Sequence, residues 1–536
     1  MASHAVPVLR AASGLVALAA IAASSGAAPP ARRSAVAGDL DFTFGRSGQV
    51  TTDISDDDEA FAIVAQPDGK LVAAGRAGGQ FALVRYDRDG TLDPIFGRSG
   101  RVTTSFPGDA GASALVLQPD GKLVAAGRAG SAFALVRYDR DGMLDPIFGQ
   151  SGRVMTSFPG DAGASALVLQ PDGKLVAAGR AGGEFALARY GPDGILDPVF
   201  GRSGRVTTAF GTDAEALALV LQPDGKLVAA GRAGTDLALV RYEPDGTLDP
   251  FFGRSGRVRT AFSGNASALA IALDADGKLV VAGRDGGRFA VARYDADGLL
   301  DVFFGTGGEV TTAFAGDDVA FAVALDCDGS LVAAGRAAGD GGSRFALARY
   351  DRRGVLDPFF GTGGQATATF SGHDEARALL LQPDGKPVAA GRASPDGVGG
   401  DVALARYEGS PDCADLASSV PAAPPGSGRV ARGPTPGVPR AASDGDLSAS
   451  ICRGEVPRGT VARRLRLANA WLARAEKTSS QRRARGSVRR AERVLARAGA
   501  AVERAGRDGT LSPPCAAAFR RLLDARLSQT RPEARR

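Results

Sequence analysis

Short apolar runs separated by glycine-rich turns recur along residues 39–408. Each copy contains the run Pro-Asp-Gly-Lys-Leu-Val-Ala-Ala-Gly-Arg or a close variant. The turn aspartates of the seven copies are Asp68, Asp120, Asp172, Asp224, Asp276, Asp328 and Asp384. They are spaced by 52 residues five times and by 56 once. A period of this length indicates that one supersecondary unit repeats along the chain.

Each repeat predicts four β-strands. In the second copy these are residues 112–118, 122–128, 132–138 and 153–158, with a hairpin turn at Pro119-Asp120-Gly121 and a glycine-rich crossing before the last strand. The strands are apolar on both faces, which is typical of strands buried on both sides. Four strands per repeat indicate a β-propeller blade. A linear β-solenoid is the alternative, although its repeats are usually shorter.

The phase of the repeat favours a closed ring. The chain begins with a strand of the fourth type at residues 49–54 and ends after a strand of the third type at residues 401–407. If the first of these completes the last blade, the ring closes and no strand edge is left unpaired there. We therefore predict an all-β, seven-bladed propeller over residues 38–408, closed by an N-terminal strand.

The pattern LDPIFGRSGRV, LVLQPDGKLVAAGR and FALVRYDRDG resembles the delta-60 repeat family over residues 39–408. This resemblance implies an exported bacterial protein with a propeller-like repeat, and it implies no shared catalytic residues. The departures are small, because Ala275 and Cys327 replace the turn proline and Ser330 replaces the lysine.

Several charged residues recur in every copy. Arg85 and Arg137 lie in third strands, and Asp93 and Asp145 lie in crossings. A functional interpretation makes them a ring of ligand groups. We favour a structural role, because an arginine between apolar strands needs a carboxylate or carbonyl partner. The stretch Asp87-Arg88-Asp89-Gly90 resembles the start of a calcium loop, but few copies keep it and no glutamate closes it. We predict neither a metal nor a cofactor.

Strand order predicts that the Pro-Asp-Gly turns and the crossings share one face, which is nearly the same in every blade. The copies differ in the loops of the opposite face, and variable loops on a rigid scaffold often carry function. Many of these loops are acidic. The candidate ligand-binding residues there are Asp56, Asp57, Asp58, Asp317, Asp318, His373 and Asp374. We expect them to face an unidentified ligand, such as a cation or a basic partner; the alternative is a solvated rim.

Catalysis has little support in the sequence. His4 and His373 are the two histidines, and no Gly-x-Ser-x-Gly motif occurs. We predict no catalytic residue and a non-enzymatic binding or scaffold protein. The alternative is a propeller hydrolase or lyase that uses paired carboxylates on a polysaccharide. A purely structural surface protein is a third possibility.

The N-terminus resembles an export signal. Arg10 precedes the apolar residues 11–23, and small residues follow near residue 28, which predicts a signal peptide over residues 1–30. An uncleaved membrane anchor is the alternative, but the apolar run is short for a bilayer span. We expect a secreted or cell-surface protein. Four cysteines in an exported chain favour disulfides, and we predict the pairs Cys327–Cys413 and Cys452–Cys515.

The C-terminal part changes character. Residues 409–450 are rich in Pro, Ala, Gly and Ser and predict a flexible linker. Residues 451–530 predict a small three-helix module, and the tail from residue 451 to residue 536 has a net charge of about +15, against about −12 for the propeller. This module could contact an anionic cell wall or membrane surface, or its charge could simply keep the protein soluble. We expect no nucleic-acid partner and a monomer.

Overall fold

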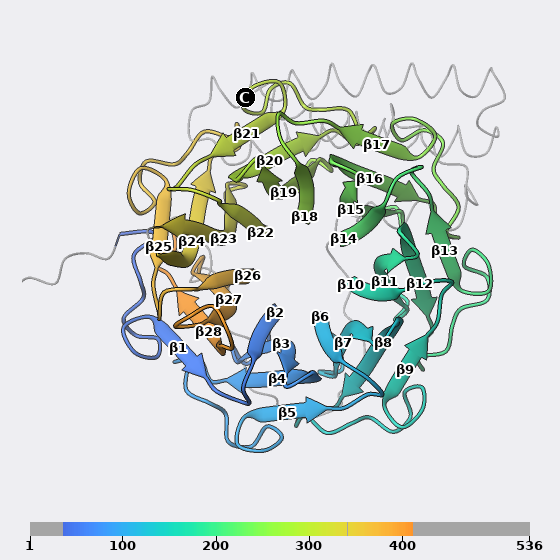
Figure 1. Ribbon diagram of the computed structural model, residues 1–536, viewed down its shortest axis with the longest axis horizontal. Coiled ribbons are helices and arrows are strands. Elements are labelled where there is room, and N and C mark those ends of the chain that lie inside the picture. The colour runs from blue at the N-terminus through green and yellow to red at the C-terminus, as the bar shows by residue number, and fades with distance from the viewer. Residues whose placement is uncertain (1–35, 340, 411–536) are drawn as a thin grey trace, which may run out of the picture. The chain divides into compact units, whose positions relative to one another are not determined.

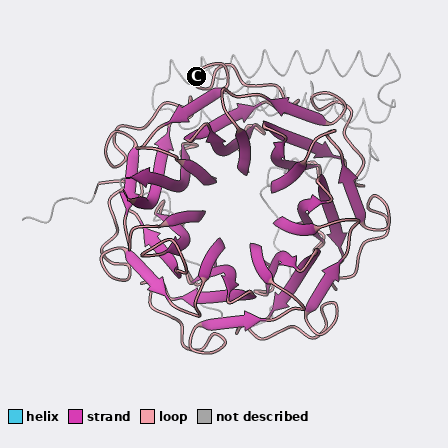
Figure 2. Ribbon diagram, in the orientation of Figure 1, coloured by secondary structure: helices cyan, strands magenta, loops and turns pink. Residues whose placement is uncertain are grey.

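The computed structural model describes residues 36–339 and 341–410. The chain divides into two units, Met1–Ala423 and Pro424–Arg536, and every described residue belongs to the first. The described residues form 28 strands in seven four-stranded antiparallel sheets, which surround a common centre (Figures 1 and 2). They include no helix long and apolar enough to cross a membrane. The predicted seven-bladed propeller is confirmed.

Each blade has an inner, a second, a third and an outer strand. The inner strands are β2 (Asp58–Ala65), β6 (Ala110–Leu117), β10 (Ala162–Leu169), β14 (Ala214–Leu221), β18 (Ala266–Leu273), β22 (Val319–Leu325) and β26 (Glu375–Leu381). The second strands are β3 (Leu71–Ala77), β7 (Leu123–Ala129), β11 (Leu175–Ala181), β15 (Leu227–Ala233), β19 (Leu279–Asp285), β23 (Leu331–Gly339) and β27 (Pro387–Ala393).

The third strands are β4 (Gln80–Tyr86), β8 (Ala132–Tyr138), β12 (Glu184–Tyr190), β16 (Asp236–Tyr242), β20 (Arg288–Tyr294), β24 (Gly342–Tyr350) and β28 (Asp401–Arg406). The outer strands are β5 (Arg101–Thr104), β9 (Arg153–Thr156), β13 (Arg205–Thr208), β17 (Arg257–Thr260), β21 (Glu309–Thr312), β25 (Gln365–Ala368) and β1 (Gln49–Thr52). Blade one begins at β2, and blade seven consists of β26, β27, β28 and β1.

The N-terminal strand closes the ring, as the phase of the repeat predicted. β1 is the outer strand of blade seven and pairs with β28, with Gln49 opposite Ala405 and Thr52 opposite Val402. The two ends of the propeller therefore lie side by side in Figure 1, where blue meets orange. Without β1, the edge of β28 would be left unpaired.

The core lies between neighbouring blades. Seven clusters of buried side chains occur in the described residues, and each joins the strands of two adjacent blades. The second and third strands are buried on both faces, which explains their continuous apolar sequences. Alanine is frequent in them, so adjacent sheets can approach closely.

The recurring arginines connect one blade to the next at six of the seven blade junctions. Arg85 Nε lies 2.7 Å from Asp93 Oδ2 in its own blade, and Arg85 Nη1 donates a hydrogen bond to the carbonyl of Arg140 in blade two. Its guanidinium also stacks over the ring of Phe96, 4.5 Å from the centroid. Arg137 and Asp145 repeat the ion pair at 2.9 Å. These contacts give the four residues a structural part in the ring.

The turns and loops divide between two faces. On the crossing face, which holds the Pro-Asp-Gly turns and the crossings, Arg88 Nε donates to the carbonyl of Asp68. On the loop face, which holds the remaining loops, Ala110 N donates to the carbonyl of Gly79 at 2.9 Å. Each inner strand begins at the loop face and soon contains a β-bulge, where one residue lacks a partner in the ladder. The bulge residues are Phe61, Ser113, Ser165, Leu217, Leu269, Phe321 and Arg377.

The predicted features at the two ends cannot be compared with this structure. The signal peptide, residues 411–450 of the linker and the three-helix module all lie outside the described residues. Cys327 lies in the turn between β22 and β23, whereas Cys413, Cys452 and Cys515 lie outside them. Both disulfide pairs stay predictions.

Candidate binding site at the seam of the ring

Three predicted ligand residues are buried and already hydrogen-bonded. Asp58, Asp318 and Asp374 stand beside the first residues of inner strands and are fully buried. Each carboxylate accepts a hydrogen bond from a backbone N–H of the preceding loop. The donor is Ile54 N for Asp58, and it is Phe314 N for Asp318 and Phe370 N for Asp374, both at 2.7 Å. Blades two to five have alanine at this position. These aspartates therefore hold their loops in shape, and a ligand-binding role for them stays a prediction.

The other predicted residues lie at the surface of the loop face. Asp56 and Asp317 are exposed, and Asp57 and His373 are half-buried. Asp57 Oδ2 pairs with Arg76 Nη2 at 2.7 Å, and Asp317 Oδ2 pairs with Arg336 Nη2 at 2.8 Å. These four belong to the variable loops of blades one, six and seven.

Two insertions join these three blades at the loop face. The longer hairpin of β23 and β24 reaches blade seven, where Ser343 N donates to the carbonyl of Gly372 at 2.7 Å. The longer loop between β27 and β28 reaches blade one, where Asp58 N donates to the carbonyl of Gly400 at 2.7 Å. The same loop contacts His373, whose backbone N–H donates a hydrogen bond to the carbonyl of Ser394. We call this region, where blades six, seven and one meet at the loop face, the seam.

A chain of ion pairs crosses the seam. Arg377, the bulge residue of β26, lies 2.8 Å from Glu59 Oε1 in blade one and 2.6 Å from Glu375 Oε2. Glu375 in turn lies 2.9 Å from Arg336 of blade six. The guanidinium of Arg377 also stacks over the ring of Phe321, 4.1 Å from the centroid. Three neighbouring blades are thus linked through Arg377, an arginine that the other six copies lack at this position.

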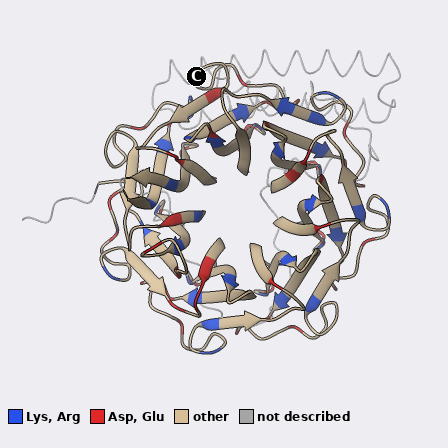
Figure 3. Ribbon diagram, in the orientation of Figure 1, with Lys and Arg blue, Asp and Glu red and all other residues tan. Residues whose placement is uncertain are grey.

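Burial changes the pKa of one carboxylate in this series of ion pairs. Glu59 is almost fully buried, and burial raises its pKa although the positive charges of Arg377 and Arg76 oppose the change. Blades two and three carry glycine at the position of Glu59 and serine at the position of Arg377. Figure 3 accordingly shows acidic residues on β2, β14 and β26 but none on β6 or β10. Sequence reasoning missed this network, although an arginine at a position held elsewhere by serine, leucine or phenylalanine was a detectable signal.

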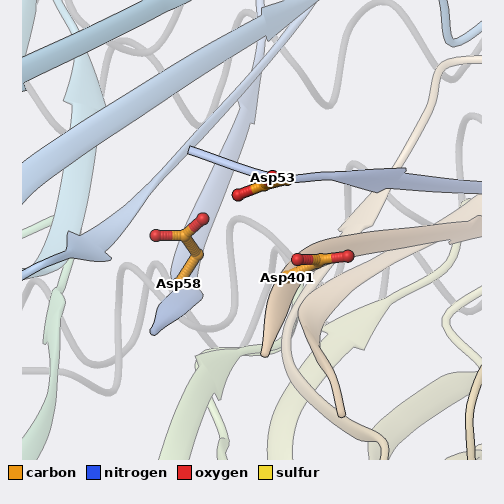
Figure 4. A group of neighbouring side chains, drawn as sticks. All are labelled: Asp53, Asp58 and Asp401. Carbon is orange, nitrogen blue, oxygen red and sulfur yellow. The ribbon is translucent and has the colours of Figure 1, made fainter. Parts of the chain in front are cut away.

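Three carboxylates come together beside the chain of ion pairs. Oxygens of Asp53, Asp58 and Asp401 all lie within 4.8 Å of one another (Figure 4). Asp58 is committed to its loop through Ser55 N and Ser55 Oγ, at 2.9 and 2.8 Å. Asp53 and Asp401 make no side-chain hydrogen bond within the described residues. Burial, together with the negative charges of Asp53 and Asp58, raises the pKa of Asp401. Two adjacent carboxylates without a counterion suit a cationic group.

The grooves on the rim of the propeller are a property of the repeat. They lie between the outer strand of one blade and the crossing of the next, and three have volumes of about 890, 610 and 600 Å³. Arg257, Gln49 and Arg153, the first residues of three outer strands, occupy the same place in each. Because they recur from blade to blade, none of these grooves distinguishes one blade as a binding site.

Comparison with protein families supports a repeat propeller. Six segments match the model described as "Domain of unknown function (DUF5122) beta-propeller": residues 66–96, 118–148, 170–200, 222–252, 275–304 and 328–360. Each begins at or near a turn of the crossing face and runs through the second and third strands into the crossing. The chain is thus a repeat β-propeller by both sequence and structure. None of the curated proteins matches it.

Solved structures show low similarity to the chain. Sqt1 from Chaetomium thermophilum is 14% identical over 67% of this chain and 98% of its own, with a TM-score of 0.41. A protein from Lactobacillus plantarum is 17% identical over 55% and 81%, with a TM-score of 0.38. The polysaccharide lyase Uly1 is 12% identical over 65% and 89%, with a TM-score of 0.37. Similarity at this level carries no conclusion about activity.

Proposed function

We propose that this protein is a non-enzymatic binding or scaffold protein of the cell envelope or extracellular space, and that its ligand contacts the seam. The observation that carries the proposal is that the features that differ between blades are concentrated at the seam. The crossing face is almost identical around the ring, whereas the seam gathers both insertions and the ion-pair chain through Arg377. Blades two and three fold without these features, so closing a blade does not require them.

The charges of the seam favour a cationic ligand. Asp53 and Asp56 are exposed, and Asp401 is half-buried beside Asp53. Unlike Asp57 and Asp317, these three have no ion pair within the described residues. Lysine or arginine side chains of a partner would neutralise these carboxylates without breaking an ion pair of the protein. A basic peptide or protein segment is therefore the ligand class that we propose.

A charge-matched comparison tests this proposal. The probe is a fluorescent octalysine peptide, and the measurement is its affinity for the full chain at low salt. We expect D53N/D56N/D401N to weaken binding at least about tenfold, because the seam would lose three negative charges that attract the lysine side chains. D109N/D161N/D213N, in the loop-face loops of blades two to four, removes the same net charge and should change affinity less than about twofold. Equal losses in both variants would reduce the effect to net charge and contradict a site at the seam.

One observation favours a second candidate function. Asp53 and Asp401 have neighbouring carboxyl oxygens, and the pKa of Asp401 is raised, as is required of a general acid in glycoside cleavage. This would make the protein a propeller hydrolase or lyase acting on a polysaccharide. Release of reducing ends from a polysaccharide panel, lost in D401N with the fold intact, would support this candidate over a binding protein.

Export and the C-terminal charge belong to the same proposal. The predicted signal peptide would deliver the propeller outside the cytoplasm, and the basic residues 451–530 would contact anionic wall or membrane components. The resemblance to the delta-60 repeat family is consistent with export. Sequencing of the mature N-terminus tests the first step, and loss of envelope retention after removal of residues 451–536 tests the second.

A further inference from the structure

Exposed apolar side chains gather on the crossing loops. Fifteen large apolar residues are exposed in the described part of the chain, and twelve of them lie in crossings. They are Phe42, Ile95, Met143, Ile147, Ile195, Val199, Phe251, Leu299, Val302, Phe303, Val355 and Phe359. Single exposed apolar residues are ordinary on a protein surface, but their concentration on one repeated element is not. We call this set the apolar ring.

The fold does not require these residues to be apolar. In blade one, Ile95 N donates to Asp93 Oδ1 at 3.2 Å, while the side chain is 69% exposed and the next residue, Phe96, fills the core. In blade seven, the equivalent position is Thr43, whose N–H and hydroxyl both donate to Asp41 Oδ1. A polar residue therefore fits the same turn. Some other property must favour the apolar residues found in the other six crossings.

The apolar ring is strongest on four consecutive blades. Phe251, Phe303, Phe359 and Phe42 occupy the crossings of blades four to seven and are 81, 83, 80 and 74% exposed. Each phenylalanine can bury on the order of 150–250 Å² when it is covered. Four such side chains in a row form a substantial apolar surface on one side of the propeller.

The geometry of the ring favours a planar partner. Six crossings join a third strand to an outer strand, and the seventh leads into the outer strand β1, so all of them lie on one face and follow the rim of the propeller (Figure 2). Hydrogen bonds connect each crossing to the next, as from Gly97 N to the carbonyl of Asp141 at 2.8 Å. The equivalent side chains of different blades are thus held at the same level of the ring, where a flat surface can contact them together.

We infer that the apolar ring docks on the interface of a lipid bilayer. Exposed polar residues such as Asp89, Arg98 and Arg254 separate the apolar tips. A protein partner would need a continuous, closely packed apolar centre, whereas a lipid interface accommodates separate apolar tips and lets neighbouring arginines extend to the phosphates. Exposed aspartates in the turns of the same face, such as Asp68 and Asp89, favour zwitterionic over anionic lipid. This contact is independent of the cationic ligand proposed for the seam on the opposite face.

Vesicle co-sedimentation of the full chain tests the inference. The probe is a phosphatidylcholine vesicle in about 0.5 M NaCl, a condition in which screening suppresses contacts made by the basic C-terminal residues. We expect the wild-type protein to sediment with the vesicles and F251T/F303T/F359T to partition at least about tenfold less. Threonine is the residue that the seventh crossing already carries at this position. The control V398T removes an 81% exposed valine from the loop face and should bind as the wild type does.

Three results would overturn the inference. The first is wild-type protein that stays in solution at millimolar lipid. The second is equal partitioning of the wild type and the folded triple variant, with folding checked by its melting temperature. The third is self-association in sedimentation velocity without lipid that the triple variant abolishes, which would make a second copy of the chain the occupant.

Discussion

The buried hydroxyl of Tyr407 has no hydrogen-bond partner within the described residues, and the residue at the place of its missing partner is Ala368. Both side chains lie in the same core cluster between blades six and seven. At each of the other six blade junctions a tyrosine hydroxyl bonds to a threonine of the preceding outer strand, as Tyr86 does to Thr52 at 2.8 Å. The seam is therefore also the junction where the repeat leaves a buried polar group unsatisfied.

We predict that A368T stabilises the protein. The new hydroxyl would meet that of Tyr407, and a buried hydrogen bond contributes about 1 kcal/mol. The site can hold threonine, because the other outer strands place it there with the same tyrosine. The free energy of unfolding, measured by denaturant titration, should increase.

Phenylalanine variants provide the matched control for this prediction. Y407F removes an unsatisfied hydroxyl and should be neutral or stabilising, whereas Y86F leaves Thr52 without its buried partner and should cost about 1–2 kcal/mol. If Y407F and Y86F were equally destabilising, the hydroxyl of Tyr407 would have a partner in solution, and the prediction for A368T would fail.

We predict that Asp41 is the most sensitive of the recurring crossing aspartates. It is fully buried and lies 2.7 Å from both Lys386 and Arg406, so it connects the N-terminal segment to the end of the propeller. D41A would leave Arg406 without a carboxylate partner, while Lys386 would keep Glu408 at 3.1 Å, and should cost about 3–5 kcal/mol. In blade six, Arg349 keeps Asp326 at 3.0 Å when Asp357 is removed. D357A should therefore cost less, and equal losses would contradict the prediction.

The lowered pKa of Asp41 predicts that the stability of the protein depends on pH. Burial alone would raise its pKa, but hydrogen bonds from Lys386 and Thr43 and the charge of Arg406 outweigh it and hold the pKa well below its ordinary value. Such a carboxylate stabilises the fold above its unfolded pKa of about 3.9, and this contribution is lost as the pH falls toward the folded pKa. As the pH falls from about 5 toward 2, the number of protons taken up on unfolding should rise by up to about one more in the wild type than in D41N. An unchanged slope of unfolding free energy against pH would contradict this.

The sequence predicted the ring more completely than it predicted the candidate site. Seven copies with a known phase determine both the number of blades and the pairing of β1 with β28. The side-chain positions of Asp58 and Asp374 depend on single residues at the loop–strand boundary, where a shift by one residue exchanges a buried for an exposed direction. The bulge that places Arg377 between Glu59 and Phe321 is likewise a local irregularity. Periodicity specifies regular pairing but gives no information about such irregularities.

We predict strong coupling between Arg377 and Glu59. R377S introduces the residue that blades two and three carry at this bulge, but it leaves the buried Glu59 without its 2.8 Å partner. An unpaired buried charge typically costs about 3–5 kcal/mol, while the more distant Arg76, 3.9 Å away, compensates in part. The double variant E59G/R377S reproduces the glycine and serine of blades two and three. It should recover most of the unfolding free energy that R377S loses.

A double-mutant cycle measures this coupling directly. Unfolding free energies of the wild type, E59G, R377S and the double variant should give an interaction energy of about 1–3 kcal/mol. The control cycle pairs R377S with D109N, an exposed position in the loop before β6, and should be additive within about 0.5 kcal/mol. Additivity in both cycles would mean that the chain of ion pairs across the seam contributes no net stability. The seam would then keep these charges for its ligand alone, and weaker octalysine binding in E59G with an unchanged fold would distinguish that case.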